Sequence, residues 1–141
     1  MSTSQPRLVL QWHPEHSVGV AQLDNEHQKF FRLMRNLYDA MKMAANKTVI
    51  GALLGELYAY SATHMTHEEE ILQKNNYPEL EEHRREHLLF RERIRTYMDE
   101  FDSRHGTISL SLLQFLQEWL GNHIVTVDQR YVEFLRSKGV R

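Results

Sequence analysis

The sequence contains no cysteine. This absence excludes disulfide bonds, zinc–thiolate sites, cysteine-ligated iron–sulfur clusters and cysteine nucleophiles. Any transition metal must therefore be held by histidine and carboxylate side chains, which suit iron, zinc, copper or manganese. The nine histidines of the chain make this possibility worth pursuing.

Long apolar runs and a strong charge of either sign are also missing. No run approaches the roughly 20 apolar residues that span a bilayer, and the N-terminus lacks the basic and then apolar segments of a secretion signal. We therefore expect a cytoplasmic protein with no membrane partner. The net charge of −2 provides no basic field for nucleic acid, and 141 residues suffice for one domain with a core.

Apolar residues recur with the period of an α-helix in four segments. We expect Asp24 and Thr48 to cap the first and second helices, and Pro78 to lie in the first turn of the third. The predicted helices cover 23–46, 49–74, 78–103, and a last segment from Thr107 or Ser109 to Gly139. Short connections between four long helices predict an all-α fold, an antiparallel up-down-up-down four-helix bundle.

Residues 1–22 are expected to form an extended, ordered N-terminal arm that packs on the bundle, with Trp12 as a packing anchor. Residues 23–141 are expected to form the bundle itself. Three histidines fall in predicted loops, where solvent exposure is the expectation: His13, His16 and His105.

Every predicted helix has a histidine on its inward face, and the second and fourth also have an acidic residue there. Residues four apart share one face of a helix, and bundles build metal sites from side chains that project inward from several helices. An isolated inward histidine is more often a satisfied core residue than a ligand. Burying the whole set without a metal would be very costly, so the sequence predicts a metal site formed by His27, His64, Glu68, His83, His87, His123 and Asp128.

The spacing of His123 and Asp128 is unusual for a helix. Five residues turn the chain about 140° beyond full register, so a regular helix would direct the two side chains apart. A π-bulge between them would bring both inward. The β-branched run from Ile124 to Val127 is a weak helix former and favours such a distortion there.

The complete pattern resembles the hemerythrin family, most closely the single-domain bacteriohemerythrins. The resemblance covers residues 10–135. It is carried by His27, His64-x-x-x-Glu68, His83-x-x-x-His87 and His123-x-x-x-x-Asp128, together with the segments around Trp12 to His27 and Trp119 to Ile124.

The resemblance implies a non-haem di-iron centre in a hemerythrin-like bundle. His83, His87 and His123 would hold one iron and His27 and His64 the other. Glu68 and Asp128 would bridge the two ions, with an oxo or hydroxo bridge completing the pair. The first iron then has six ligands and the second five, which leaves one octahedral position where dioxygen would bind.

The resemblance also implies an apolar pocket for O2 beside this position, lined by Trp119, Leu120, Ile124 and Met65. Met65 stands where the family usually has phenylalanine. A thioether makes the pocket softer and more easily oxidised.

The expected function is reversible O2 binding for transport, storage or delivery, in a monomer that is not an enzyme. Ferritin-like di-iron enzymes use more carboxylates and fewer imidazoles, and fewer anionic ligands make high-valent iron harder to reach. An oxidase or reductase is a candidate partner. The alternatives are an O2 or redox sensor acting through a partner, a di-iron enzyme that reduces peroxide or nitric oxide, and a structural zinc or manganese bundle.

Four further residues lie near the predicted ligands. His67 is expected at the surface or behind the ligands, and a role in proton relay would favour the enzyme. Glu69 and Glu70 are expected at the surface, with contact to a ligand open for either. Tyr131 is expected to pack in the core, although it could reach the carboxylate of Asp128.

Overall fold

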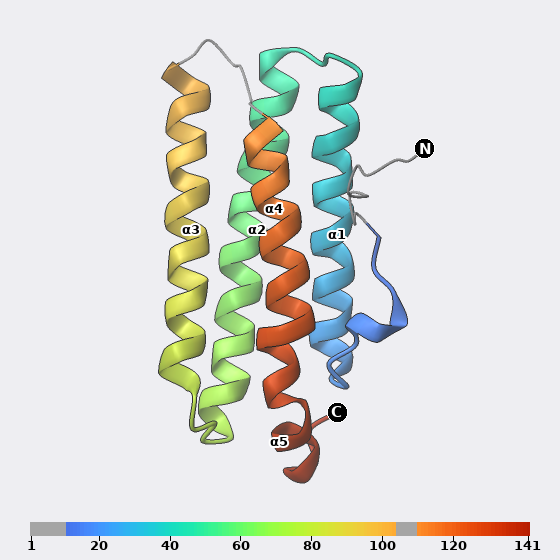
Figure 1. Cartoon of the computed structure of the whole chain (residues 1–141), viewed down its shortest axis with the longest axis vertical. Helices are drawn as coiled ribbons and strands as arrows, with labels where there is room; N and C mark the ends of the chain where they lie inside the picture. Colours follow the sequence, from blue (N-terminus) through green and yellow to red (C-terminus); the bar gives the residue numbers. More distant parts are fainter. Residues whose placement is uncertain (1–10, 104–109) are drawn as a thin grey trace, which may run out of the picture.

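The computed structural model describes residues 11–103 and 110–141, and these contain helices and turns but no strand. The four long helices run alternately up and down (Figure 1), which confirms the expected all-α bundle. Two more helical turns and a short helix follow α4, and a single 3-10 turn, η1, precedes α1. The elements are η1 (Pro14–His16), α1 (Ala21–Lys42), α2 (Lys47–Lys74), α3 (Leu80–Ser103), α4 (Leu110–Asn122), η2 (His123–Val127), η3 (Asp128–Tyr131) and α5 (Val132–Ser137).

The first two helices begin earlier than the sequence predicted, and both expected N-caps are wrong. Asp24 lies inside α1, where its carboxylate accepts hydrogen bonds from the Ser17 hydroxyl at 2.6 Å and the Val18 N–H at 2.8 Å. It thereby fastens the arm to the helix. The N-cap of α2 is Asn46, whose side chain accepts from the Val49 N–H at 3.0 Å. Asparagine is a better N-cap than threonine, so the helix starts before Thr48.

The connection from α2 to α3 is a tight turn. Asn76 has a positive φ of 59°, and the Tyr77 N–H bonds back to the Leu72 carbonyl at 2.9 Å. α3 begins at Leu80, so Pro78 lies in the turn before the helix and not in its first turn. The expected start of the last helix at Thr107 or Ser109 lies outside the described residues, as does His105.

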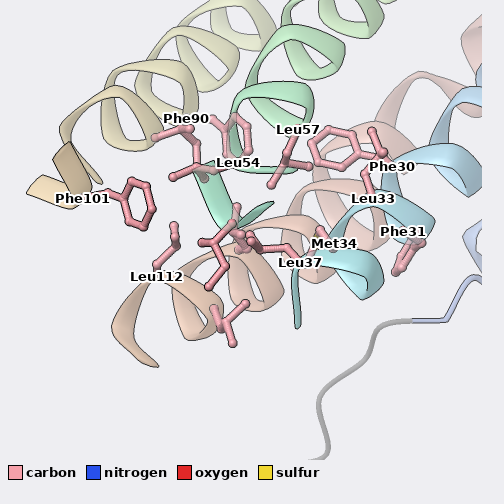
Figure 2. Close-up of a cluster of buried hydrophobic side chains, with 14 of the residues drawn as sticks. Phe30, Phe31, Leu33, Met34, Leu37, Leu54, Leu57, Phe90, Phe101 and Leu112 are labelled. Carbon is pink, nitrogen blue, oxygen red and sulfur yellow. The ribbon is translucent and has the colours of Figure 1, made fainter. Parts of the chain in front are cut away.

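A large apolar cluster fills one end of the bundle, and Figure 2 shows its side chains converging from all four long helices. A smaller cluster closes the opposite end; it includes Leu23, Leu72 and Tyr131. Along α1, His27 lies between Leu23 of the small cluster and Phe30 of the large one. The predicted ligands therefore occupy a layer between two apolar regions.

The arm packs against the bundle through Val18 and Val20, which are buried, and Trp12, which is partly buried. His16 is also buried, contrary to the exposure expected from its loop. Its ring packs on Phe31 at 5.2 Å between centroids, and its Nδ1 accepts from the His13 N–H at 2.8 Å. His13 itself is exposed. Among the described helices, none combines the length and apolarity that crossing a membrane would need.

Candidate metal centre

The seven predicted ligands meet in one buried layer, where each is at most 3% exposed. The start of α1, the end of α2, the start of α3 and the end of α4 lie at the same end of the bundle (Figure 1). We call His83, His87 and His123 the three-histidine half, and His27 and His64 the two-histidine half. Donor atoms within 4.8 Å of one another form two groups that share Glu68: one with the three-histidine half and Asp128, one with the two-histidine half.

The helix widens between His123 and Asp128, as the sequence predicted. A π-helix spans His123–Val127, and the Asp128 N–H bonds to the His123 carbonyl five residues earlier. A 3-10 turn, Asp128–Tyr131, follows. The extra residue in the turn lets both side chains face the centre, and this prediction is confirmed.

The two oxygens of Glu68 are divided between the two halves. Oε1 lies 2.6 Å from His83 Nε2 and 3.0 Å from His87 Nε2. Oε2 lies 3.5 Å from His27 Nε2 and 3.7 Å from His64 Nε2. Each oxygen of this carboxylate thus belongs to a different group of imidazoles.

The two carboxylate oxygens of Asp128 also face different halves. Its Oδ1 lies 3.0 Å from His123 Nε2 and 3.2 Å from His83 Nε2, whereas Oδ2 lies 3.4 Å from His27 Nε2. Two donor atoms that are each about 2.1 Å from a metal and at right angles lie about 3 Å apart. The spacings therefore suit two metal ions with both carboxylates between them.

The imidazoles and carboxylates of this layer shift one another's pKa values. Burial by itself lowers the pKa of His83 and His123, but the Asp128 and Glu68 carboxylates outweigh it and raise the pKa values to about 10 and about 9. Burial works in the opposite direction on Glu68 and Asp128, and their imidazole neighbours still lower both pKa values. The carboxylates are therefore anionic at neutral pH and attract cations, which can be protons or metal ions.

Several buried polar atoms of this layer have no hydrogen-bond partner within the described part of the chain. They are both nitrogens of His27, Nδ1 of His123 and both oxygens of Asp128. Unpartnered buried polar groups are costly and point to a missing ion or water. Five imidazoles and two carboxylates are also a suitable donor set for iron, so the residues fit a pair of metal ions.

Carboxylates behind the ligands hold two of the imidazoles. Glu26 Oε1 accepts from His64 Nδ1 at 2.7 Å, and its Oε2 lies 2.7 Å from Nδ1 of His67. Glu69 Oε2 accepts from His87 Nδ1 at 2.7 Å. These bonds leave Nε2 of each ligand histidine free to face the centre. His67 and Glu69 thus lie behind the ligands, Glu70 is exposed, and Glu26 was missed by the sequence analysis.

Tyr131 is fully buried, and its hydroxyl donates to Glu68 Oε2 at 2.9 Å. Burial and the charge of Glu68 raise its pKa well above the usual value, so the hydroxyl keeps its proton. The side chain therefore packs in the core and also fixes one oxygen of the shared carboxylate. The contact is with Glu68, whereas the sequence had suggested Asp128.

A narrow apolar space, too tight to hold a water molecule, adjoins the centre, and we call it the cavity. It is lined by His27, Phe30, His64, Met65, His87, Trp119, His123 and Ile124. The Trp119 ring stacks on His123 at 4.3 Å between centroids, with 11° between the planes. Three of the four expected pocket residues line this cavity, Phe30 is an addition, and the side chain of Leu120 lies outside the described residues.

A second, polar pocket opens at the surface beside the three-histidine half. His83 forms part of its wall, together with Arg85, Glu86 and Arg130. The centre thus has an apolar cavity on one side and a charged, solvent-facing pocket on the other.

The sequence matches the family model described as the hemerythrin HHE cation binding domain over residues 18–135. It is 27% identical over 129 residues to a bacteriohemerythrin of Stenotrophomonas maltophilia, which covers 92% of this chain and 83% of that protein. A myohemerythrin of Riftia pachyptila is 28% identical over 120 residues, covering 85% of this chain and 88% of that protein.

A crystal structure of a hemerythrin point mutant superposes with a TM-score of 0.82 at 25% identity, covering 90% of this chain and 97% of that one. The sequence match, the fold and the histidine- and carboxylate-rich layer agree with one another. At the level of the family, they support an oxygen-binding protein with a di-iron centre. The chain belongs to the hemerythrin family.

Proposed function

We propose that this protein binds dioxygen reversibly at a di-iron centre, for transport, storage or delivery of oxygen. The observation that supports this most directly is the division of the Glu68 and Asp128 oxygens between the two halves. A carboxylate with one oxygen facing each half is arranged to bridge two ions.

In this proposal His83, His87 and His123 hold one iron, and His27 and His64 hold the other. Glu68 and Asp128 bridge them, with an oxo or hydroxo group as the third bridge. Iron in such a site supplies electrons that dioxygen can take up and return. The two-histidine half has one ligand fewer, so its iron offers the vacant position for O2.

The surrounding side chains keep this position dry. Both histidines of the two-histidine half line the narrow cavity together with His87 and His123, and its other walls are Phe30, Met65, Trp119 and Ile124. An apolar shell limits the entry of water, which would promote irreversible oxidation of the centre. It also limits the entry of bulky reductants, which would reduce the bound oxygen. Glu26 and Tyr131 hold His64 and Glu68 in place through the hydrogen bonds described above.

One observation favours the enzyme alternative. His67, whose side chain is 40% exposed, is linked through Glu26 to the proposed ligand His64 by two contacts of 2.7 Å. A hydrogen-bonded line from solvent to the centre would serve a reaction that consumes protons, such as peroxide reduction. If that is the function, replacing His67 by asparagine should slow peroxide turnover; a carrier should show no such turnover to slow.

The proposal is tested by the visible spectrum of the ferrous protein. Admission of O2 to anaerobic, iron-loaded protein should produce a charge-transfer band, and removal of O2 under vacuum should abolish it. Protein loaded with zinc is the control and should show no band. Immediate and irreversible conversion to the oxidised form would contradict reversible binding.

A further inference from the structure

Met65 has a position that no other described methionine shares. It lies on α2 directly after His64 and is fully buried. It lines the narrow cavity opposite six other described side chains from α1, α3, α4 and η2. Met34 is equally buried but is not part of that wall, and Met43 is 80% exposed. Among the described residues, Met65 is therefore the one methionine at the cavity, and Met34 and Met43 serve as references elsewhere.

We propose that Met65 is an internal oxidation site, at which a hydroperoxide formed in the cavity is consumed by conversion of the thioether to the sulfoxide. This inference rests on the proposed O2-binding function, because the oxidant arises when bound oxygen is lost as peroxide instead of as O2.

The chemistry balances without a further reactant. A pair of ferrous ions held by the proposed ligands would supply two electrons to dioxygen, which would take up two protons and leave as hydrogen peroxide. The sulfur lone pair of Met65 then attacks one peroxide oxygen, the O–O bond breaks, and the other oxygen departs as water. The sulfur is oxidised by two electrons and the peroxide is reduced by two.

The other walls of the cavity offer no comparable acceptor. The imidazoles of His27, His64, His87 and His123 are engaged as the proposed ligands, and Phe30 and Ile124 carry no lone pair. The indole of Trp119 is stacked face to face on His123, which covers one side of its ring. Among the described residues at the cavity, the thioether is therefore the most reactive group toward a hydroperoxide.

Exposure alone predicts the opposite order of oxidation. Peroxide that arrives from solvent should modify Met43 first, since its side chain is 80% exposed and that of Met65 is fully buried. Preferential oxidation of the buried residue would thus report where the oxidant was made.

The experiment follows oxygen incorporation by peptide mass spectrometry. Ferrous protein is taken through repeated oxygenation and re-reduction with catalase present, and the sulfoxide fraction is measured at Met34, Met43 and Met65. We expect Met65 to be modified several-fold more than the other two, with no change when catalase is omitted. An unmodified Met65 after the optical band has decayed, equal modification of Met43, or suppression by catalase would each overturn the proposal.

Zinc-loaded protein treated with added hydrogen peroxide provides the reference order. There Met43 should be oxidised before Met65, and the reverse order would overturn the proposal because burial would then give no protection. In matched variants, Met65→Leu should remove the oxygen gain of the α2 peptide, whereas Met34→Leu should leave it. A reversible optical band with no oxidation of Met65 defeats this inference alone, whereas absence of the band defeats the proposed function.

Discussion

The two halves of the metal centre share both carboxylates but differ in ligand number and surroundings. The three-histidine half draws its imidazoles from α3 and from the π-helical segment after α4, and its His83 borders a polar surface pocket. The two-histidine half comes from α1 and α2, and both of its imidazoles line the apolar cavity. All imidazoles of the half with fewer ligands thus adjoin the cavity. The three-histidine half borders the cavity through His87 and His123 and the polar pocket through His83.

This difference suggests that the two halves have different roles. A full ligand set beside a polar pocket holds an ion without offering a place for a substrate. An incomplete set beside an apolar cavity offers a position for a small neutral molecule such as O2 and little accommodation for anions. The following changes break or sharpen this contrast, beginning with the largest expected effect.

Replacement of Glu68 by glutamine should disrupt both halves together, since its two oxygens serve one half each. Loss of the shared anion should lower bound iron from about two ions per chain to fewer than one. Iron content after gel filtration measures this. The exposed Glu70, two residues along α2, provides the matched control, because Glu70→Gln should retain the full complement. Full iron content in the Glu68→Gln protein would show that the carboxylate is not shared.

Replacement of Glu26 by glutamine should weaken the two-histidine half, and Glu69→Gln the other half. Each change removes the anionic acceptor of an imidazole N–H, to His64 or His87. Such changes typically lower metal affinity by about 10–100-fold. Transfer of iron to a chelator measures retention, and Glu26→Gln should have the larger effect because its half has fewer ligands. Equal rates of iron transfer in both variants and in the unmodified protein would contradict the supporting role of Glu26 and Glu69.

Replacement of Ile124 by alanine should accelerate irreversible oxidation of the O2-bound protein, because it opens the cavity wall. Ile94 is the matched control: both isoleucines are at most 1% exposed and belong to the same apolar cluster, but Ile94 does not line the cavity. Each truncation should cost about 2–5 kcal/mol of unfolding free energy. Only Ile124→Ala should shorten the lifetime of the optical band, and equal shortening by both would assign the effect to general destabilisation.

Acidification should loosen the arm that covers α1, with the smallest effect of the four. Burial lowers the pKa of His16 below its ordinary value of 6.5, although the charge of Glu15 opposes this. As pH falls below 6.5, the unfolded arm takes up a proton that the packed arm resists, so stability is lost toward acid. The protection factors of the Val18 and Gly19 amides in iron-loaded protein, in which the pH dependence of intrinsic exchange is divided out, should be lower at about pH 5.5 than at about pH 7.5. In His16→Leu this pH dependence should disappear; its persistence would assign it to another group.

The predicted ligands could be recognised in the sequence because helical periodicity fixes which residues share a face. His64 with Glu68, and His83 with His87, need only a regular turn to point together. His123 and Asp128 violate that rule, and the violation itself indicated the π-helix that the structure contains. Residue spacing was thus sufficient to predict both the regularly spaced ligand pairs and the irregular pair of the proposed set.

Residues whose partners come from other helices were harder to predict. Glu26 contacts His64 and His67 only because α1 and α2 pack at a particular rotation and height. The contact of Tyr131 with Glu68, and that of Glu69 with His87, likewise depend on tertiary packing. His16 is buried because the arm folds back onto Phe31, and no local pattern in the arm signals this.

Iron-edge anomalous diffraction from crystals of iron-loaded protein tests the central claim most directly. The account predicts two iron peaks within the layer of seven side chains, one beside His83, His87 and His123, the other beside His27 and His64. The second ion should have an open coordination position directed at the cavity. A single peak, or a second ion whose coordination by protein side chains is complete, would contradict the account.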